Sequence, residues 1–208
     1  MRILYIDTSS SYLYTGIVEN GKLLCEVKKE FGHSLSEEAL PEIVSMFEKK
    51  ELTANDIDKI IVVNGPGSFT GIRIGITIAK VYAWSLNIPI STITSLEAMM
   101  LSSEDNTIRV PMIDARRKYV FSAIYDENNN AILKPQHIKI EDLNEVLKNI
   151  SNYIVITNDE IEEFISKKSY EPNIEKIVNF YQDKEEVNPH AVNPDYLKIT
   201  EAEESKIN

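Results

Sequence analysis

The sequence has little of what would mark a secreted or membrane protein. Its 208 residues contain one cysteine, Cys25, so no intramolecular disulfide framework can form. Cys25 follows two leucines, which favours a place in the core over a nucleophilic role. The N-terminal residues lack the apolar segment and cleavage site of a secretory signal, and no run reaches the roughly 18 apolar residues of a membrane span. We therefore expect a cytoplasmic protein that does not contact a membrane.

Positive charge is also scarce. The formal net charge is -11, and both halves of the chain are acidic. Proteins that bind nucleic acid by themselves usually carry a basic surface, because neutralising phosphates supplies most of the non-specific affinity. Residues 116–118 (Arg-Arg-Lys) are the one basic cluster, and a solvated loop is its plain interpretation. If RNA is involved, we expect a partner to do most of the binding.

Common catalytic motifs are missing as well. Neither H-E-x-x-H nor G-x-S-x-G occurs, which argues against a protease. His33, His137 and His190 are scattered without the spacing of metal ligands. We expect them to be ordinary surface or loop histidines, and we predict no metal site.

The hydrophobic pattern predicts an α/β protein of two lobes, residues 1–106 and 107–208, with mixed sheets covered by helices. Asn20-Gly21 between two apolar runs predicts a tight hairpin. Ser34 and Glu37 have the spacing of a capping box at a helix start. Strands are expected at residues 3–7, 12–18, 22–28, 60–63, 88–93, 109–114, 119–125, 138–140 and 153–157. Helices are expected from residue 34 to about 49 and at 69–86, 95–101, 141–150, 160–167 and 174–181. No internal repeat is evident.

The most informative segment is residues 65–75, Gly-Pro-Gly-Ser-Phe-Thr-Gly-Ile-Arg-Ile-Gly, which follows a buried strand and opens a helix. Such a junction is a natural anion site, because the first amides of a helix point outward. The glycine spacing nevertheless matches neither the dinucleotide-binding nor the P-loop motif. The alternative is that the glycines permit a tight turn and close packing.

Two predicted helices are apolar on more than one side. In the helix at residues 69–86, one stripe contains Ile72, Ile76, Ala79, Ala83 and Leu86, and a second contains Ile74, Ile78, Val81 and Tyr82. The helix that begins near residue 34 repeats the pattern. A sheet can cover only one stripe, so the other predicts a protein–protein interface, with paired helices from two chains forming a four-helix bundle. The alternative is that the two helices cover each other and the sheet.

Four segments resemble the TsaB family, formerly YeaZ. They are residues 65–75, the opening Met-Arg-Ile-Leu-Tyr-Ile-Asp-Thr-Ser, Ile-Asp-Ala-Arg at 113–116 and Asn-Pro-Asp-Tyr-Leu-Lys at 193–198. The resemblance covers the whole first lobe but only the first strand and the tail of the second. It implies a two-lobed actin-like ATPase, RNase H-like fold.

The resemblance also implies a function. TsaB belongs to the bacterial machinery that makes threonylcarbamoyl-adenosine next to the tRNA anticodon, and it is regarded as a non-catalytic scaffold. The implied partners are a TsaD-like catalytic subunit and a TsaE-like ATPase, with tRNA bound through the complex. A separate enzyme makes the threonylcarbamoyl-adenylate donor. The contact with the catalytic subunit falls on the first-lobe helices. The predicted interface residues are Leu35, Leu40, Ile43, Val44, Phe47, Arg73, Ile74, Ile78, Val81 and Tyr82.

The chain departs from its catalytic relatives at two points. Ser95 and Met99 stand where the catalytic paralogue has its H-x-x-x-H metal ligands. Residues 7–11 contain no glycine, unlike the first phosphate loop of actin-like ATPases, so we expect no intrinsic cofactor, with ATP or ADP at most at the interface of the complex. The candidate weak anion site comprises Asp7, Thr8, Gly65, Gly67, Ser68, Thr70 and Gly71. For Asp7, the alternative to anion binding is that its carboxylate caps the loop at the end of the strand.

Three interpretations stay open at this stage. The first is the scaffold, the second an independent enzyme of the actin-like kinase, carbamoyltransferase or glycoprotease kind, and the third a homodimer that pairs the same apolar helices. Three hypotheses also stay open for the guanidinium of Arg73: it contacts the partner across the subunit interface, it contacts a nucleotide, or it forms an intramolecular salt bridge.

Overall fold

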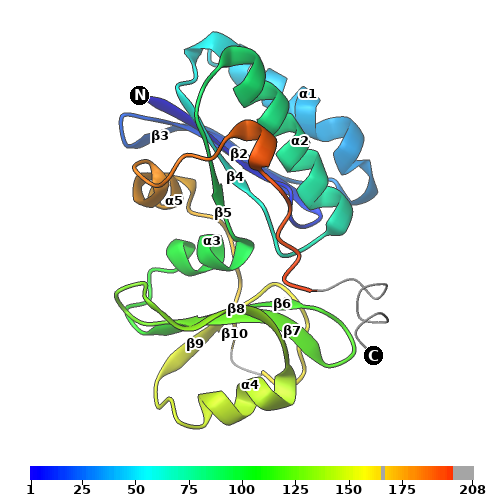
Figure 1. The fold of residues 1–208 in the computed structure, drawn as a ribbon, viewed down its shortest axis with the longest axis vertical. Coiled ribbons are helices and arrows are strands. Elements are labelled where there is room, and N and C mark those ends of the chain that lie inside the picture. Colours follow the sequence, from blue (N-terminus) through cyan, green and yellow to red (C-terminus); the bar gives the residue numbers. More distant parts are fainter. Residues whose placement is uncertain (165–166, 199–208) are drawn as a thin grey trace.

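The computed structural model describes residues 1–164 and 167–198, which form two lobes, each built on a β-sheet (Figure 1). The first lobe contains β1 (Arg2–Asp7), β2 (Tyr12–Glu19), β3 (Lys22–Glu30), α1 (Leu35–Glu48), β4 (Lys59–Val63), α2 (Phe69–Leu86), β5 (Ile90–Ile93) and α3 (Ser95–Ser102). There follow β6 (Ile108–Asp114), β7 (Tyr119–Tyr125), β8 (Ala131–Lys139), α4 (Ile140–Leu147), β9 (Tyr153–Ile156), β10 (Lys167–Lys168) and α5 (Ile174–Tyr181). Short 3-10 helices lie at Gly32–Ser34, Ala54–Asp56 and Pro189–Ala191.

The two sheets have the same topology. Their strand orders are β3-β2-β1-β4-β5 and β10-β9-β6-β7-β8. β1 pairs antiparallel with β2 and parallel with β4, and β6 pairs antiparallel with β7 and parallel with β9. β6 is therefore the second-lobe equivalent of β1. The fold contains an internal structural repeat that the sequence does not reveal.

Both faces of the first sheet are covered, and β1 shows how. Leu4 and Ile6 point toward the cluster under α1 and α2, whereas Ile3 and Tyr5 point toward the cluster formed with α3 and α5. This alternation is the period-2 pattern of a strand between two helical layers. In Figure 1, α1 and α2 lie side by side over one face of the sheet.

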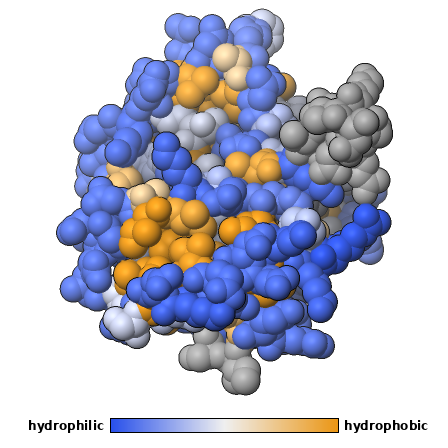
Figure 2. All heavy atoms as spheres, turned by 60° about the horizontal axis from the view of Figure 1, so that its bottom comes forward, coloured by the Kyte–Doolittle hydropathy of each residue, from blue (hydrophilic) through white to orange (hydrophobic). Residues whose placement is uncertain are grey.

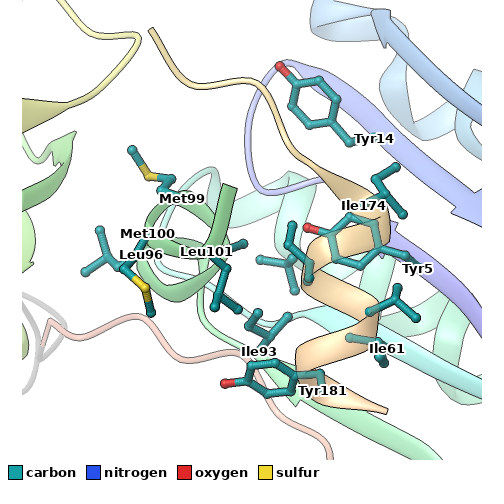
Figure 3. Packing of buried hydrophobic residues seen from close by; sticks show 14 of the residues in the cluster. Tyr5, Tyr14, Ile61, Ile93, Leu96, Met99, Met100, Leu101, Ile174 and Tyr181 are labelled. Carbon is teal, nitrogen blue, oxygen red and sulfur yellow. The ribbon is translucent and has the colours of Figure 1, made fainter. Parts of the chain in front are cut away.

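The last part of the chain returns to the first lobe. Ile174, Ile177 and Tyr181 of α5 are buried in the same cluster as Tyr5 of β1 (Figure 3). Val187 forms a bridge with Ile90 of β5. The predicted second lobe of residues 107–208 is therefore too long, because the described segment from α5 onward completes the core of the first lobe.

Most predicted elements are present, and α2, β7 and α5 have the predicted limits. Asn20 and Gly21 adopt the positive φ angles, 49° and 82°, of the predicted hairpin. The helix predicted at residues 160–167 is wrong: residues 160–164 are irregular, and Lys167 belongs to strand β10. The predicted capping box is also wrong, because the Ser34 hydroxyl donates to the carbonyl of Phe31 and caps no helical amide.

Candidate functional site

The loop after β1 lies directly on the start of α2. The Thr8 hydroxyl donates to the carbonyl oxygen of Gly71 over 2.7 Å, and the Ser68 amide donates to the carbonyl oxygen of Ser9, also over 2.7 Å. The Ser68 hydroxyl caps the helix by accepting from the Gly71 amide. The loop after β1 and the start of α2 are thus tied together by two hydrogen bonds.

The glycines of residues 65–75 make this close approach possible. A Cβ atom on Gly67 would lie closer than 3.0 Å to the Ser9 carbonyl, and one on Gly71 would meet the Thr8 carbonyl equally closely. The neighbouring atoms are backbone, which cannot move aside cheaply. Packing therefore accounts for these glycines, and the anion site built on them and on Thr70 stays a prediction.

Asp7 ends β1 beneath this loop and is 2% exposed. One carboxylate oxygen accepts from the Ser9 amide over 2.8 Å, and the other lies 3.5 Å from the Tyr5 hydroxyl. Burial raises the pKa of Asp7, and the bond from Ser9 only partly offsets this effect. The loop-capping alternative describes the contacts that Asp7 makes.

A cleft of about 1140 Å³ opens beside Asp7. It includes the ends of the two equivalent strands, Asp7 of β1 and Asp114 of β6. Its ionisable lining groups other than tyrosine are five carboxylates (Asp7, Glu30, Asp114, Asp159 and Glu171) and two cations (Lys28 and Arg116). Lys28 is already paired with Glu26 and Glu171. Such a lining disfavours a bare polyphosphate, because the excess charge is negative.

The tail motif of residues 193–198 packs against the glycine segment. The Asp195 amide donates to the carbonyl of Asn64 over 2.8 Å, and the Asp195 carbonyl lies where a side chain on Gly65 would point. Two motifs that are 130 residues apart in the sequence are thus parts of one structural unit.

Arg73 is held within its own chain. Its Nε–H donates to the Tyr196 hydroxyl over 2.7 Å, and its guanidinium carbon lies 3.8 Å from the centre of the Phe69 ring. Phe69 and Tyr196 stack with 4.9 Å between ring centres. The alternative that Arg73 makes an intramolecular contact is therefore correct in part. The contact consists of a hydrogen bond and a cation–π interaction, and not of the expected salt bridge.

Part of the predicted interface is on the surface. Leu40 and Val44 on α1 are 51% and 47% exposed, and Val81 on α2 is 60% exposed. Trp84, which the sequence analysis missed, is 64% exposed. It stands three residues after Val81, a spacing that could have identified it. We call these four residues the α1/α2 surface.

The other predicted interface residues are less accessible. Leu35, Ile43 and Phe47 are buried in the protein's own core, so their assignment to an exposed interface is corrected. Half-buried Ile74 and Ile78 pack on the cluster that contains Leu35, and Tyr82 stacks on Phe47. The two helices thus cover each other in part, as the alternative required. They still leave the four residues of the α1/α2 surface exposed, in addition to Phe69, which stacks on Tyr196 at the start of α2.

Apolar exposure is not confined to α1 and α2. Ile132 on β8 is 53% exposed, and Figure 2, viewed from the side of the second lobe, shows apolar areas within a mainly hydrophilic surface. Exposure alone therefore does not identify an interface. The grouping of large side chains on two adjacent helices distinguishes the α1/α2 surface.

The described residues offer no evident metal site. No group of three His, Cys, Asp or Glu side chains among them could hold a metal ion. Ser95 is buried and donates to the carbonyl of Pro66 over 2.6 Å, and Met99 is buried in the core.

Among the described helices, none is long and apolar enough to span a bilayer.

Comparison with known proteins agrees with these observations. The family model of tRNA N6-adenosine threonylcarbamoyltransferase (TsaD) matches residues 29–195. The tRNA threonylcarbamoyladenosine biosynthesis protein TsaB of Bacillus subtilis is 31% identical, and the alignment covers 98% of this chain and 96% of that protein. The chain belongs to the TsaB family. TsaB of Escherichia coli is 29% identical over 65% of this chain and 64% of its own length.

Solved structures show the same fold as this member of the TsaB family. YeaZ from Pseudomonas aeruginosa superposes with a TM-score of 0.76 at 17% identity, covering 94% of this chain and 100% of that chain. A second Pseudomonas aeruginosa structure, of an uncharacterized protein with similarity to peptidase YeaZ, reaches a TM-score of 0.80 at 18% identity, with coverages of 95% and 99%. The predicted two-lobed actin-like, RNase H-like fold is confirmed.

Proposed function

We propose that this chain is the accessory subunit of a complex that makes threonylcarbamoyl-adenosine in tRNA, and that it binds a TsaD-like catalytic subunit through the α1/α2 surface. Membership in the TsaB family supports the pathway. The observation that carries the binding surface is the exposure of Leu40, Val44 and Val81 on two adjacent helices. Burying half-exposed side chains of this size contributes about 1 kcal/mol each.

A helical docking surface suits a paralogous partner. A protein with the same fold would present its own pair of helices over its sheet, and two pairs can form a four-helix bundle. Ile74, Ile78 and Tyr82 would then lie in the groove between α1 and α2 and contact the incoming helices. A TsaE-like ATPase joins this assembly in the proposal.

We place the nucleotide at the interface of the complex and not in this chain alone. The excess of carboxylates in the cleft argues against independent binding of ATP. The chain's role is then to assemble and order the catalytic subunit, which carries out the transfer.

Reconstitution tests this function. The TsaD-like and TsaE-like proteins of the same organism would be supplied with threonylcarbamoyl-adenylate and unmodified tRNA, with and without this chain. We expect modified adenosine only when the chain is present. Full modification without it would refute the proposal, whereas ATP or peptide turnover by the purified chain alone would favour an independent enzyme.

The homodimer alternative uses the same exposed residues. Sedimentation of the chain alone, and then with the catalytic subunit, separates the two associations. A homodimer that persists unchanged when the catalytic subunit is added in excess would oppose the proposed heterodimer.

A further inference from the structure

Arg73 is fixed in position although it is exposed. Its guanidinium carbon lies 3.8 Å from the centre of the Phe69 ring, and its Nε–H donates to the Tyr196 hydroxyl over 2.7 Å. Phe69 and Tyr196 also stack on each other, so the three side chains form one cluster. A surface arginine usually loses rotamer freedom when it binds a ligand, whereas this arginine is already ordered before binding.

The guanidinium still has unused donors. Arginine carries five N–H groups in a planar fork, and within residues 1–164 and 167–198 the Nε–H is the one that has an acceptor. The Asp195 carboxylate, next to Tyr196 in the sequence, accepts from the Leu197 amide instead. Arg73 is also absent from the described residues that line the acidic cleft. An ordered fork with open donors at Nη1 and Nη2 suits a carboxylate, which can accept two parallel hydrogen bonds.

The two helices of the α1/α2 surface differ in charge. α1 contains four glutamates and no basic residue, whereas α2 contains Arg73 and Lys80 and no acidic residue. The Lys80 ammonium donates to the carbonyl oxygens of His190 and Val192, at 3.3 and 3.0 Å. Arg73 is thus the cation that α2 can offer to another molecule. Because opposite potentials meet across specific interfaces, the group that docks beside it should be an anion.

Arg73 lies on the same side of α2 as part of the α1/α2 surface. Thr77 and Val81 follow it at intervals of four residues, and all three are exposed. Positions eight residues apart are separated by about 12 Å along a helix axis, so one incoming helix of about three turns can cover both Val81 and Arg73. Arginine and tryptophan are among the residues that contribute most to binding at interfaces, and Trp84 lies further along the same helix.

The tail of the chain borders α2 on one side (Figure 1). His190 meets Trp84 edge to face near the end of the helix, with 6.2 Å between ring centres, and Tyr196 stacks on Phe69 at its start. Val192, between these two contacts, is buried in the core. The tail therefore runs antiparallel to α2 and is fastened along it, which gives the Tyr196 hydroxyl a fixed place from which to orient Arg73.

We propose that Arg73 is a specificity-determining residue of the docking surface: its Nη1 and Nη2 bind one Asp or Glu side chain of the TsaD-like subunit, while Phe69 and Tyr196 hold the guanidinium in place. The proposal rests on the proposed function, because it names the chemistry of the partner group that meets α2. A partner without a carboxylate at this point would bury the fork without acceptors, which costs affinity and excludes wrong partners.

Calorimetric titration of the chain and its variants with the TsaD-like subunit tests the proposal. Arg73→Met removes the charge and the donors but keeps an apolar side chain on Phe69. Arg73→Lys keeps the charge without the planar fork. Lys80→Met is the matched control, because it removes the other cation of α2 and two bonds to the tail but leaves Arg73 in place. Thermal unfolding of each variant measures stability separately.

We expect Arg73→Met to weaken binding about thirtyfold, as for the residues that dominate other interfaces. Arg73→Lys should recover only part of this loss, because an ammonium cannot make two parallel bonds to a carboxylate. Tyr196→Phe, which keeps the ring and removes the hydroxyl, should weaken binding less than Arg73→Met. Lys80→Met should bind nearly as well as the wild type. Equal losses in Arg73→Met and Lys80→Met would assign Arg73 a purely structural role and overturn the proposal.

A charge swap identifies the partner group. Arg73→Glu should nearly abolish binding, because two carboxylates would then meet. The acidic residues on the docking helices of the catalytic subunit are replaced by arginine one at a time, and one replacement should restore binding of the Arg73→Glu chain to within about tenfold of the wild-type pair. Failure of every replacement would overturn the proposal. So would a loss of self-association with binding of the catalytic subunit intact, which would assign the carboxylate to a second copy of this chain.

The two proposals fail in different ways. If the wild-type chain does not associate with the catalytic subunit, the proposed docking function is refuted, and the role of Arg73 is refuted with it. If the wild-type chain associates and Arg73→Met binds equally tightly, the docking function stands and only the role of Arg73 is overturned.

Discussion

The hydroxyl of Thr8 donates to the carbonyl oxygen of Gly71 over 2.7 Å, joining the loop after the first strand to the first turn of α2. The Thr8 carbonyl occupies the space that a side chain on Gly71 would need. This contact sets the distance between β1 and α2, and hence the position of the α1/α2 surface on the lobe.

Gly71→Ala should therefore destabilise the protein although alanine is the better helix former. Overpacking against backbone costs about 1–3 kcal/mol or more, which exceeds the roughly 1 kcal/mol gained in helix propensity. We expect a lower midpoint of urea unfolding. Thr77→Ala, at an exposed position of the same helix, should leave the midpoint unchanged or raise it. A Gly71→Ala variant as stable as the wild type would show that the loop containing Thr8 can move away from α2 at little energetic cost.

Val81→Glu should abolish binding of the catalytic subunit. Val81 is exposed, so the fold should tolerate the change within about 0.5 kcal/mol. At an interface the unpaired carboxylate would cost several kcal/mol, or about a hundredfold or more in Kd. Ile132→Glu, a similar change on β8, is the control for general effects of a new charge. Equal loss of binding in both variants, measured by calorimetry, would argue against the α1/α2 surface.

Trp84 is the single tryptophan of the chain and is 64% exposed on α2. If the α1/α2 surface binds the catalytic subunit, the indole leaves water and its fluorescence emission moves to shorter wavelength. The titration is read with a catalytic subunit whose own tryptophans have been replaced by phenylalanine. Sedimentation establishes the concentration at which the catalytic subunit saturates this chain. Unchanged emission at that concentration would place Trp84 outside the interface.

Asp7→Asn should stabilise the protein at neutral pH. Burial raises the pKa of Asp7, so the folded protein retains the proton at pH values where the unfolded carboxyl, with a pKa of about 3.9, has lost it. The protonated form therefore stabilises the fold below about pH 4, and this contribution is lost as the pH rises through the folded-state pKa. Asparagine cannot ionise and keeps an oxygen for the Ser9 amide.

The gain in melting temperature from Asp7→Asn should be large at pH 7 and shrink toward pH 4. Thermal unfolding monitored by circular dichroism across this range measures it. A difference between variant and wild type that is independent of pH would show that ionisation of Asp7 does not affect stability.

The sequence predicts elements well where a local signal and tertiary packing agree. Asn20-Gly21 between two apolar runs is a strong hairpin signal, and the β-branched run at residues 60–63, followed by Gly-Pro-Gly, indicates a buried strand. The error at residues 160–167 has a physical cause. Ile161 and Phe164 are buried three residues apart, as on a helix, but β10 begins at Lys167 and leaves too little chain for a crossover helix.

The candidate site was predicted only in part, because one sequence does not show which apolar stripe faces the sheet. Leu40 and Val44 are exposed, whereas Ile43 and Phe47, on the neighbouring side of α1, are buried. The packing of the tail on the glycine segment joins residues that are far apart in sequence, and no local pattern encodes it. The internal repeat is equally hidden, since the two lobes share strand order without evident shared residues.

The return of α5 to the first lobe has a consequence for biosynthesis. Ribosomes release the chain from its N-terminus, and domains generally fold as units during synthesis. Tyr5 and Tyr14 are made long before their packing partners Ile174, Ile177 and Tyr181. The first strands must therefore wait, with apolar surface open to chaperones, until α5 has left the exit tunnel.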